Sequence, residues 1–292
     1  FAFIPIQGVR GDEFVEDEPF REVFTEAEAG TGVPEINAVY AIVMDVETGR
    51  VLFEKNAYRK TPMASTTKIM TAILAIENGN LDDVVTVSEK AASIWGSTIN
   101  LTKGQKIKLR DLLYGLLLSS GNDAAIAIAE HIGGTEGKFL SMMNQKAREI
   151  GAKNTSFKSP HGLDREGHYT TAYDLALITR YALENPVFSR IVGTRSISIS
   201  YRGLYNTNEM LDAYPGADGV KTGYTGKAGR CLVTSATRNG QRIISVVINS
   251  PSRYARALSS RLILDYAFNN YKVYTLIKQG EIIRSIPVYK GV

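Results

Sequence analysis

The chain has 292 residues, of which 44% are hydrophobic and 22% charged, so it can bury a sizeable core and is neither a disordered nor a fibrous protein. Its net charge is +4, but residues 1–30 carry eight acidic and two basic side chains (net −6), which leaves +10 on the rest and favours anionic partners. The sequence contains no run of five basic residues, no apolar run of about 20 residues and a single cysteine, so we expect no nucleic-acid partner, no spanning helix, no internal disulfide and no metal or other cofactor.

The chain begins with a segment that differs from the rest. Residues 1–33 are acidic and lack hydrophobic periodicity, so we expect a poorly ordered extension outside the core. Two apolar, β-favouring runs at 38–45 and 50–55 flank a turn that contains glycine and predict a β-hairpin. Apolar residues at helical spacing then predict a buried helix that begins after Pro62 and stops at Gly79.

Helical patterns dominate the middle of the chain and strand patterns return near its end. A loop at 154–168, rich in glycine, proline, serine and charge, is a candidate rim of a functional site. The predicted helices cover 109–118, 123–132, 136–150, 171–183 and 253–269, and the predicted late strands cover 196–201, 219–224, 231–237 and 242–249. Strands at both ends with helices between them imply one sheet assembled from the two chain ends, with an inserted helical region.

The first motif that carries chemistry is Ser65-Thr66-Thr67-Lys68, which places a hydroxyl and an amine on one face of the predicted helix start. A lysine can take the proton of a serine if burial or a neighbouring cation favours the neutral amine. Unpaired N–H groups at a helix start can also stabilise an oxyanion. Because this spacing arises about once by chance in a chain of this length, a surface coincidence is an open alternative.

The second motif, Ser120-Gly121-Asn122, follows an apolar helix and is expected at a helix end that faces a cleft. Ser120 can relay a proton, and the amide of Asn122 can orient Lys68 and a substrate carbonyl. The alternative is an N-cap for the helix that starts near Asp123.

The third motif, Lys221-Thr222-Gly223, lies on a predicted strand, where alternation places Lys221 and Gly223 on one side and Thr222 on the other. A glycine weakens a strand unless another group must approach the backbone closely. Taken alone, this tripeptide is also a common turn fragment.

The three motifs occur once each, in this order, with their first residues 55 and 101 positions apart. With this trio the sequence resembles the penicillin-binding proteins and class A β-lactamases. In finer detail it resembles the low-molecular-mass D-alanyl-D-alanine carboxypeptidases of serine peptidase family S11. The finer resemblance covers about residues 36–270 and includes the stretches 112–125, 159–164 and 218–229.

The resemblance implies an α+β fold of the β-lactamase/transpeptidase type. We expect an antiparallel sheet of about five strands built from both chain ends, with helices on its faces and an inserted helical region. It further implies a penicillin-binding serine peptidase domain at 34–270, and the start of a truncated C-terminal β-rich domain at 271–292. Membrane anchoring would then require a segment beyond this sequence.

The resemblance also implies a role for each catalytic residue. Ser65 would be the acylated nucleophile and Lys68 its general base. Ser120 would pass a proton towards the leaving amine, and Asn122 would hold the substrate backbone.

A second group is implied to bind the substrate. Lys221 and Thr222 would bind the terminal carboxylate, Lys221 would help to keep Lys68 neutral, and the N–H groups of Ser65 and Tyr224 would form an oxyanion hole beside Gly223. Arg256 matches a family arginine that supports carboxylate recognition, with a solvated helix-start residue as the alternative. Some relatives carry another arginine where residues 206–208 here read Asn-Thr-Asn.

Other conspicuous residues have simpler explanations. Trp95 either edges the cleft or packs in the core, and Cys231 is expected to be a buried small hydrophobe. We expect part of the 154–168 loop to be scaffolding, because the three motifs already supply a base. The loop residues concerned, which resemble a metal or acid–base cluster, are His161, Asp164, Glu166 and His168.

The family mechanism makes a serine-type D-Ala-D-Ala carboxypeptidase the leading hypothesis. Ser65 would attack the bond between the last two D-alanines of a peptidoglycan stem peptide, and water would release the acyl-enzyme. β-Lactam antibiotics would acylate the same serine.

Two alternatives remain. Class A β-lactamases use a loop glutamate in an E-x-x-L-N pattern, whereas Glu166 here is followed by Gly-His-Tyr, which disfavours that activity. A β-lactam sensor or wall-binding module would be acylated by penicillin but release almost no D-alanine.

The substrate lies outside the cytoplasmic membrane, so we expect an extracytoplasmic protein at the outer face of that membrane or in the cell wall. The sequence opens with Phe-Ala-Phe-Ile-Pro and no initiator Met. Both the stub of a removed export signal and a trimmed chain are consistent with this opening.

Overall fold

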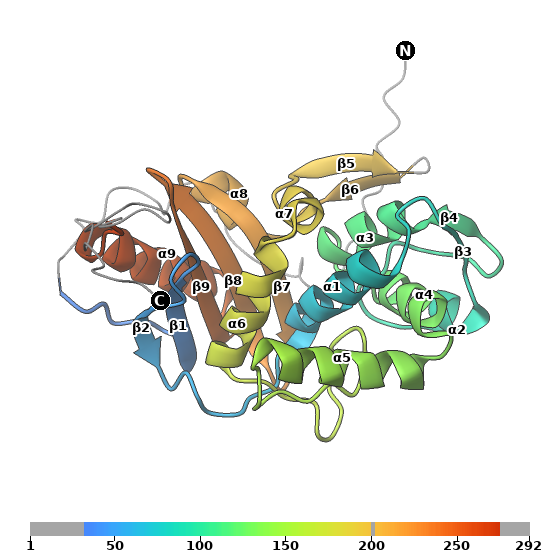
Figure 1. Cartoon of the computed structure of the whole chain (residues 1–292), viewed down its shortest axis with the longest axis horizontal. Helices are drawn as coiled ribbons and strands as arrows, with labels where there is room; N and C mark the ends of the chain where they lie inside the picture. The colour runs from blue at the N-terminus through green and yellow to red at the C-terminus, as the bar shows by residue number, and fades with distance from the viewer. Residues whose placement is uncertain (1–31, 200–201, 275–292) are drawn as a thin grey trace, which may run out of the picture.

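The computed structural model describes residues 32–199 and 202–274 (Figure 1). The predictions for the acidic extension and for the C-terminal β-rich segment therefore fall almost entirely outside the described residues. Within the described ranges, no helix is both long and apolar enough to cross a bilayer.

The central element is a five-stranded antiparallel sheet in the order β2-β1-β9-β8-β7. Strand β1 pairs with β2 on one side and with β9 on the other, which joins the two ends of the described chain. This arrangement confirms the predicted fold. The strands are β1 (Tyr40–Asp45), β2 (Val51–Lys55), β7 (Ala217–Thr225), β8 (Gly229–Arg238) and β9 (Gln241–Ser250).

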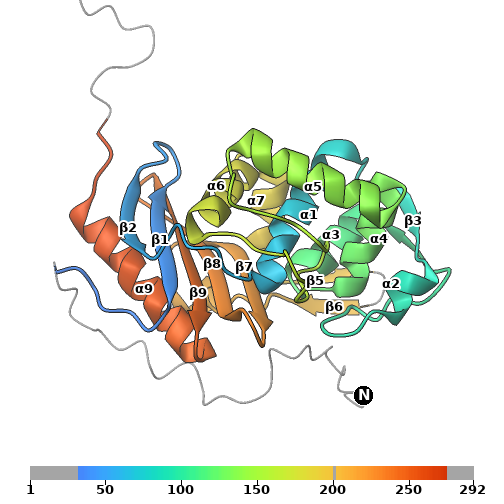
Figure 2. The ribbon, with the colours of Figure 1, turned by 90° about the horizontal axis from the view of Figure 1, so that it is seen from below.

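Both faces of the sheet are covered, and this explains the nearly continuous apolar sequence of its central strands. Helix α9 (Arg253–Asn270) packs on one face, and α6 (Ala172–Leu183) and α7 (Pro186–Val192) lie on the opposite face (Figure 2). In β1, Ala41 and Val43 belong to the core beneath α9, whereas Ile42 and Met44 belong to the larger core shared with the other helices.

The inserted helical region lies beside β7 (Figure 1). Helix α1 is preceded by a 3-10 turn, η3 (Ala64–Thr67), so Ser65 lies in this turn rather than in the predicted α-helix itself. The other elements are α1 (Lys68–Asn78), α2 (Glu89–Ser93), α3 (Leu109–Leu117), α4 (Asn122–Gly133) and α5 (Glu136–Ile150), with the hairpin of β3 (Val84–Thr86) and β4 (Lys106–Lys108).

Several helix starts follow from local capping. The side chains of Thr135, Thr171 and Ser252 each accept a hydrogen bond from a backbone N–H in the first turn of α5, α6 and α9. Short elements escaped the sequence prediction because a few residues carry little periodicity. Besides α2, α7, β3 and β4, they are β6 (Arg202–Tyr205), which pairs with β5 (Ser196–Ile199), and α8 (Met210–Ala213).

Candidate active site

The turn that carries Ser65 lies directly against strand β7. A Cβ atom built on Gly223 would lie 2.9 Å from Ser65 N, closer than real Cβ atoms approach other atoms, and 3.1 Å from Ala64 Cβ, which is also tight. Only glycine therefore lets the strand approach the turn, which is the close approach that the strand glycine predicted. The first and third motifs are thus adjacent.

Lys68 is fully buried at the start of α1 and contacts both neighbouring motifs. Its Nζ lies 2.8 Å from Ser65 Oγ, 2.8 Å from Asn122 Oδ1 and 2.7 Å from the His161 carbonyl oxygen. The two carbonyl oxygens only accept hydrogen bonds, so they suit the two N–H groups of a neutral amine. To take the proton of Ser65, the amine must be in this neutral form, with its lone pair towards the hydroxyl.

Asn122 is held by two backbone contacts of its own. Its Nδ2 donates to the carbonyl oxygen of Trp95 (2.9 Å), which fixes the orientation of the amide and leaves Oδ1 for Lys68. Its backbone N–H donates to the carbonyl oxygen of Ser97 (2.7 Å). Asn122 therefore joins the amine to the loop that forms one wall of the site.

Ser120 does not act as an N-cap. The N-cap of α4 is Gly121, without a side-chain cap bond, and Ser120 has a left-handed backbone with φ 59°. Its Oγ is buried and has no hydrogen-bond partner among the described residues. An unsatisfied buried hydroxyl costs about 1–3 kcal/mol, which suits a group that bonds only to a bound substrate.

The residues predicted to bind the substrate carboxylate, Lys221 and Thr222, lie on β7, the strand whose Gly223 abuts the turn that carries Ser65. Lys221 and Thr222 are buried, and Thr222 Oγ1 lies 2.6 Å from the hydroxyl of Thr207. Tyr224 is half exposed, and the guanidinium of Arg230 lies 4.1 Å from its ring centroid. Thr207 was missed, because nothing in its sequence context indicates that it meets Thr222.

Arg256 is not the solvated helix-start residue that we considered. It is fully buried and forms a two-pronged ion pair with Glu209, with both N–O distances at 2.9 Å. A carboxylate of this chain therefore already offsets its charge. Support of substrate-carboxylate recognition by Arg256 stays a prediction.

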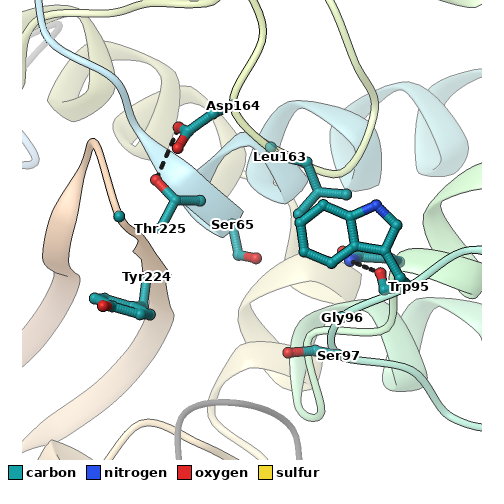
Figure 3. Close-up of a pocket in the computed structure, with 11 residues that line it drawn as sticks. Ser65, Trp95, Gly96, Ser97, Leu163, Asp164, Tyr224 and Thr225 are labelled. Atoms are coloured by element: carbon teal, nitrogen blue, oxygen red, sulfur yellow. Dashed lines mark hydrogen bonds between the residues drawn. The ribbon is translucent and has the colours of Figure 1, made fainter.

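A pocket of about 300 Å³ opens over Ser65 (Figure 3). Trp95 and Tyr224 lie on opposite sides of the serine, and Trp95 is 68% exposed, so it edges the cleft rather than packing in the core. The lining residues are Ser65, Trp95, Gly96, Ser97, Asn122, Gly162, Leu163, Asp164, Tyr224, Thr225 and Gly226.

Two carboxylates that the motifs do not include shape the pocket. Asp164 accepts hydrogen bonds from Thr225 Oγ1 (2.8 Å) and Lys227 N (3.3 Å), which ties the 154–168 loop to the end of β7 (Figure 3). Asp123 accepts from Ile99 N and Leu101 N and fixes the loop that carries Trp95. Burial raises the pKa of Asp123.

The 154–168 loop supports η3, the turn that carries Ser65 (the nucleophile turn), in agreement with the scaffolding prediction. A Cβ on Gly162 would lie 1.9 Å from the Ala64 carbonyl oxygen, and Thr71 Oγ1 donates to the Pro160 carbonyl oxygen (2.6 Å). Within the part of the chain that the structure describes, no group of three or more His, Cys, Asp and Glu side chains could hold a metal ion. Cys231 is a buried thiol, as predicted.

The two histidines of this loop are buried and neutral. Burial lowers the pKa of His161 to about 3. Burial lowers the pKa of His168 to about 4. Both side chains therefore stay neutral at physiological pH, which excludes them as cationic groups in the site.

We expect the free energy of unfolding to fall as the pH drops from 7 to 5. Histidine in the unfolded chain titrates near pH 6.5, whereas His161 and His168 in the folded chain bind protons only near pH 3 and pH 4. Between these values the unfolded chain binds more protons, so each histidine removes up to about 1.4 kcal/mol per pH unit.

Urea unfolding at pH 7, 6 and 5 measures this slope. The variant His168→Phe lacks one of the two titrating groups and should lose about half of the histidine contribution. An identical slope in wild type and variant would contradict the assignment.

An α+β fold with a buried lysine beside a serine at the edge of an antiparallel sheet defines a serine peptidase of the penicillin-binding class, and comparison with known proteins agrees. Residues 26–252 match the model of the S11 peptidase family, D-alanyl-D-alanine carboxypeptidase. The D-alanyl-D-alanine carboxypeptidase DacF of Bacillus subtilis (strain 168) is 41% identical over 261 residues, which cover 86% of this chain and 67% of the relative.

Solved structures give the same result. The crystal structure of the Streptomyces K15 DD-transpeptidase has a TM-score of 0.77 and 35% identity, and covers 81% of this chain and 98% of its own. The D-alanyl-D-alanine carboxypeptidase DacD from Francisella tularensis has a TM-score of 0.79 and 32% identity, with 87% of this chain and 76% of its own covered. The chain belongs to the D-alanyl-D-alanine carboxypeptidase family S11, which confirms the predicted class of serine peptidase.

Proposed function

We propose that the protein removes the terminal D-alanine from peptidoglycan stem peptides that end in D-Ala-D-Ala. The observation that carries the proposal is the contact of Lys68 Nζ with Ser65 Oγ at 2.8 Å, while Asn122 Oδ1 and the His161 carbonyl oxygen occupy the other directions around the amine. This geometry suits proton transfer from a nucleophile to its base.

In the acylation step, Lys68 takes the proton of Ser65 as Oγ bonds to the carbonyl carbon of the penultimate D-alanine. The N–H groups of Ser65 and Tyr224 stabilise the oxyanion that develops on the carbonyl oxygen. The C–N bond then breaks as Ser120 gives its proton to the leaving amine of D-alanine, and the proton that Lys68 took from Ser65 passes to Ser120, which restores the hydroxyl and the neutral amine. Water cleaves the Ser65 ester in the second half of the reaction and regenerates the hydroxyl.

Substrate binding rests on the third motif. Lys221 and Thr222 bind the terminal carboxylate. The Thr207 hydroxyl lies 2.6 Å from the Thr222 hydroxyl and positions that hydroxyl. Asn122 holds the substrate backbone. β-Lactam antibiotics bind in the same place and acylate Ser65. Since the peptide substrate is part of the cell wall, the protein acts outside the cytoplasm.

The experiment that tests this function measures free D-alanine. We expect the wild-type protein to release D-alanine from an N-acylated peptide ending in L-Lys-D-Ala-D-Ala in large molar excess over enzyme, and Ser65→Ala to release none. A penicillin adduct without D-alanine turnover would indicate a sensor or wall-binding module instead. Rapid hydrolysis of excess penicillin would indicate a β-lactamase.

A further inference from the structure

The peptide group between Ala64 and Ser65 is held at its carbonyl end by a chain of three hydrogen bonds. Thr67 Oγ1 lies 2.8 Å from the Ala64 carbonyl oxygen and 2.9 Å from His168 Nε2. The other ring nitrogen of His168, Nδ1, lies 2.9 Å from the backbone nitrogen of Lys158. Thr67, His168 and Ala64 are all buried, so water does not compete for these bonds.

The donors and acceptors in this chain can be assigned without ambiguity. The N–H of Lys158 can only donate, so His168 Nδ1 accepts and the neutral ring carries its proton on Nε2. The Ala64 carbonyl can only accept, so the Thr67 hydroxyl donates to it and accepts from His168 Nε2. All three hydrogen bonds therefore donate in the same direction, from the 154–168 loop towards the turn that carries Ser65.

The far end of the same peptide group is the N–H of Ser65. A peptide bond is planar and trans, so its C=O and N–H point in opposite directions, and fixing one fixes the other. The Ser65 nitrogen lies next to β7, since a Cβ on Gly223 would be 2.9 Å from it. A hydrogen bond to the carbonyl also polarises the group and strengthens the N–H as a donor.

The backbone at this point needs such support. Ala64 has φ 48°, a left-handed conformation that costs a residue with a side chain about 1–2 kcal/mol and persists only where its surroundings hold it. Without the bond from Thr67, the strained peptide would lose one of the contacts that fix its orientation. Rotation would turn the Ser65 N–H away from the pocket.

We propose that Thr67 and His168 are positioning residues for the oxyanion hole. Their hydrogen bonds fix the Ala64 carbonyl, and the orientation of this peptide group directs the Ser65 N–H at the substrate carbonyl. This inference rests on the proposed function, because it assigns the Ser65 N–H as an oxyanion donor. It predicts that a hydroxyl with no contact to the substrate controls the rate of both acylation and deacylation.

The test compares Thr67→Val, Thr67→Ser and Thr66→Val. We expect Thr67→Val to slow acylation by a fluorescent penicillin about 10-fold to 100-fold, a part of the effect of deleting an oxyanion donor. Thr67→Ser keeps the hydroxyl and should recover most of the rate. Thr66→Val is a matched control, since Thr66 Oγ1 donates to the Met63 carbonyl oxygen in the same turn but not to the peptide group of Ser65.

The infrared stretching frequency of the ester carbonyl in the penicilloyl enzyme shows whether Thr67 positions the Ser65 N–H or only stabilises the folded protein. We expect a higher frequency in Thr67→Val than in wild type, because a weaker oxyanion contact polarises the ester less, and no change in Thr66→Val. The variant His168→Phe, which keeps the ring packed on Phe157, should shift the band in the same direction.

One outcome would overturn this inference alone, and another would overturn the proposed function. An unshifted ester band and an unchanged acylation rate in Thr67→Val, with wild type acylated normally, would overturn the inference and leave the proposed function intact. Failure of penicillin to acylate the wild-type protein would instead overturn the proposed function.

Discussion

Lys68→Met is expected to slow the acylation of Ser65 by penicillin about 100-fold to 10,000-fold, the range that a positioned general base contributes. Methionine has a similar length and suits a buried position, but it can neither accept the proton of Ser65 nor donate to Asn122 Oδ1 and the His161 carbonyl oxygen. Stopped-flow acylation with a labelled penicillin measures the effect.

The variant leaves two buried acceptors without their donor, at a cost of about 1–3 kcal/mol each, so its melting temperature must be recorded alongside the rate. Lys60→Met is the matched control, because Lys60 precedes the turn but is exposed and contacts Tyr169 instead of the site. A folded Lys68→Met protein that is acylated within about 10-fold of wild type would show that another group is the base.

Gly223→Ala should slow acylation about 10-fold to 100-fold. The added methyl group would lie 2.9 Å from Ser65 N, 3.1 Å from Ala64 Cβ and 3.2 Å from Thr66 N, so strand β7 and the nucleophile turn must separate. The displacement is small, but catalytic groups must be held within about 0.5 Å of their productive geometry. Both the acylation rate and the release of D-alanine report the loss.

The control for this substitution is Gly137→Ala on helix α5, where an added Cβ meets nothing within 4 Å. It should leave acylation unchanged and stabilise the helix slightly. Gly223→Ala with a wild-type acylation rate would mean that the turn and the strand need not touch for the reaction.

Much of the fold follows from patterns in the sequence. Strand β9 was predicted at 242–249 and is observed at Gln241–Ser250, because both of its faces are buried and its apolar run is long. Helix α5 was predicted with its observed bounds, since Thr135 caps its start and Gly151, in the left-handed region, ends it. The short helices α2, α7 and α8 and the three-residue strands β3 and β4 were missed, because so few residues carry too little periodicity.

The site also contains residues that the sequence predicts and residues that it does not. Ser65, Lys68, Ser120 and Asn122 were found because each motif combines chemically reactive groups at short spacing, and the structure joins Ser65 and Asn122 through Lys68. Glu209 and Thr207 were missed because their partners Arg256 and Thr222 are 47 and 15 positions away in sequence. Pairings of this kind depend on how the segments pack, which no local pattern records.

The most direct measurement is the intact mass of the protein after exposure to penicillin, followed by mapping of the modified peptide. We expect one penicilloyl group per chain, attached to Ser65, and no mass increase in Ser65→Ala. An adduct on any other residue, or a Ser65→Ala protein that is modified as fully as wild type, would contradict the assignment of Ser65 as the nucleophile.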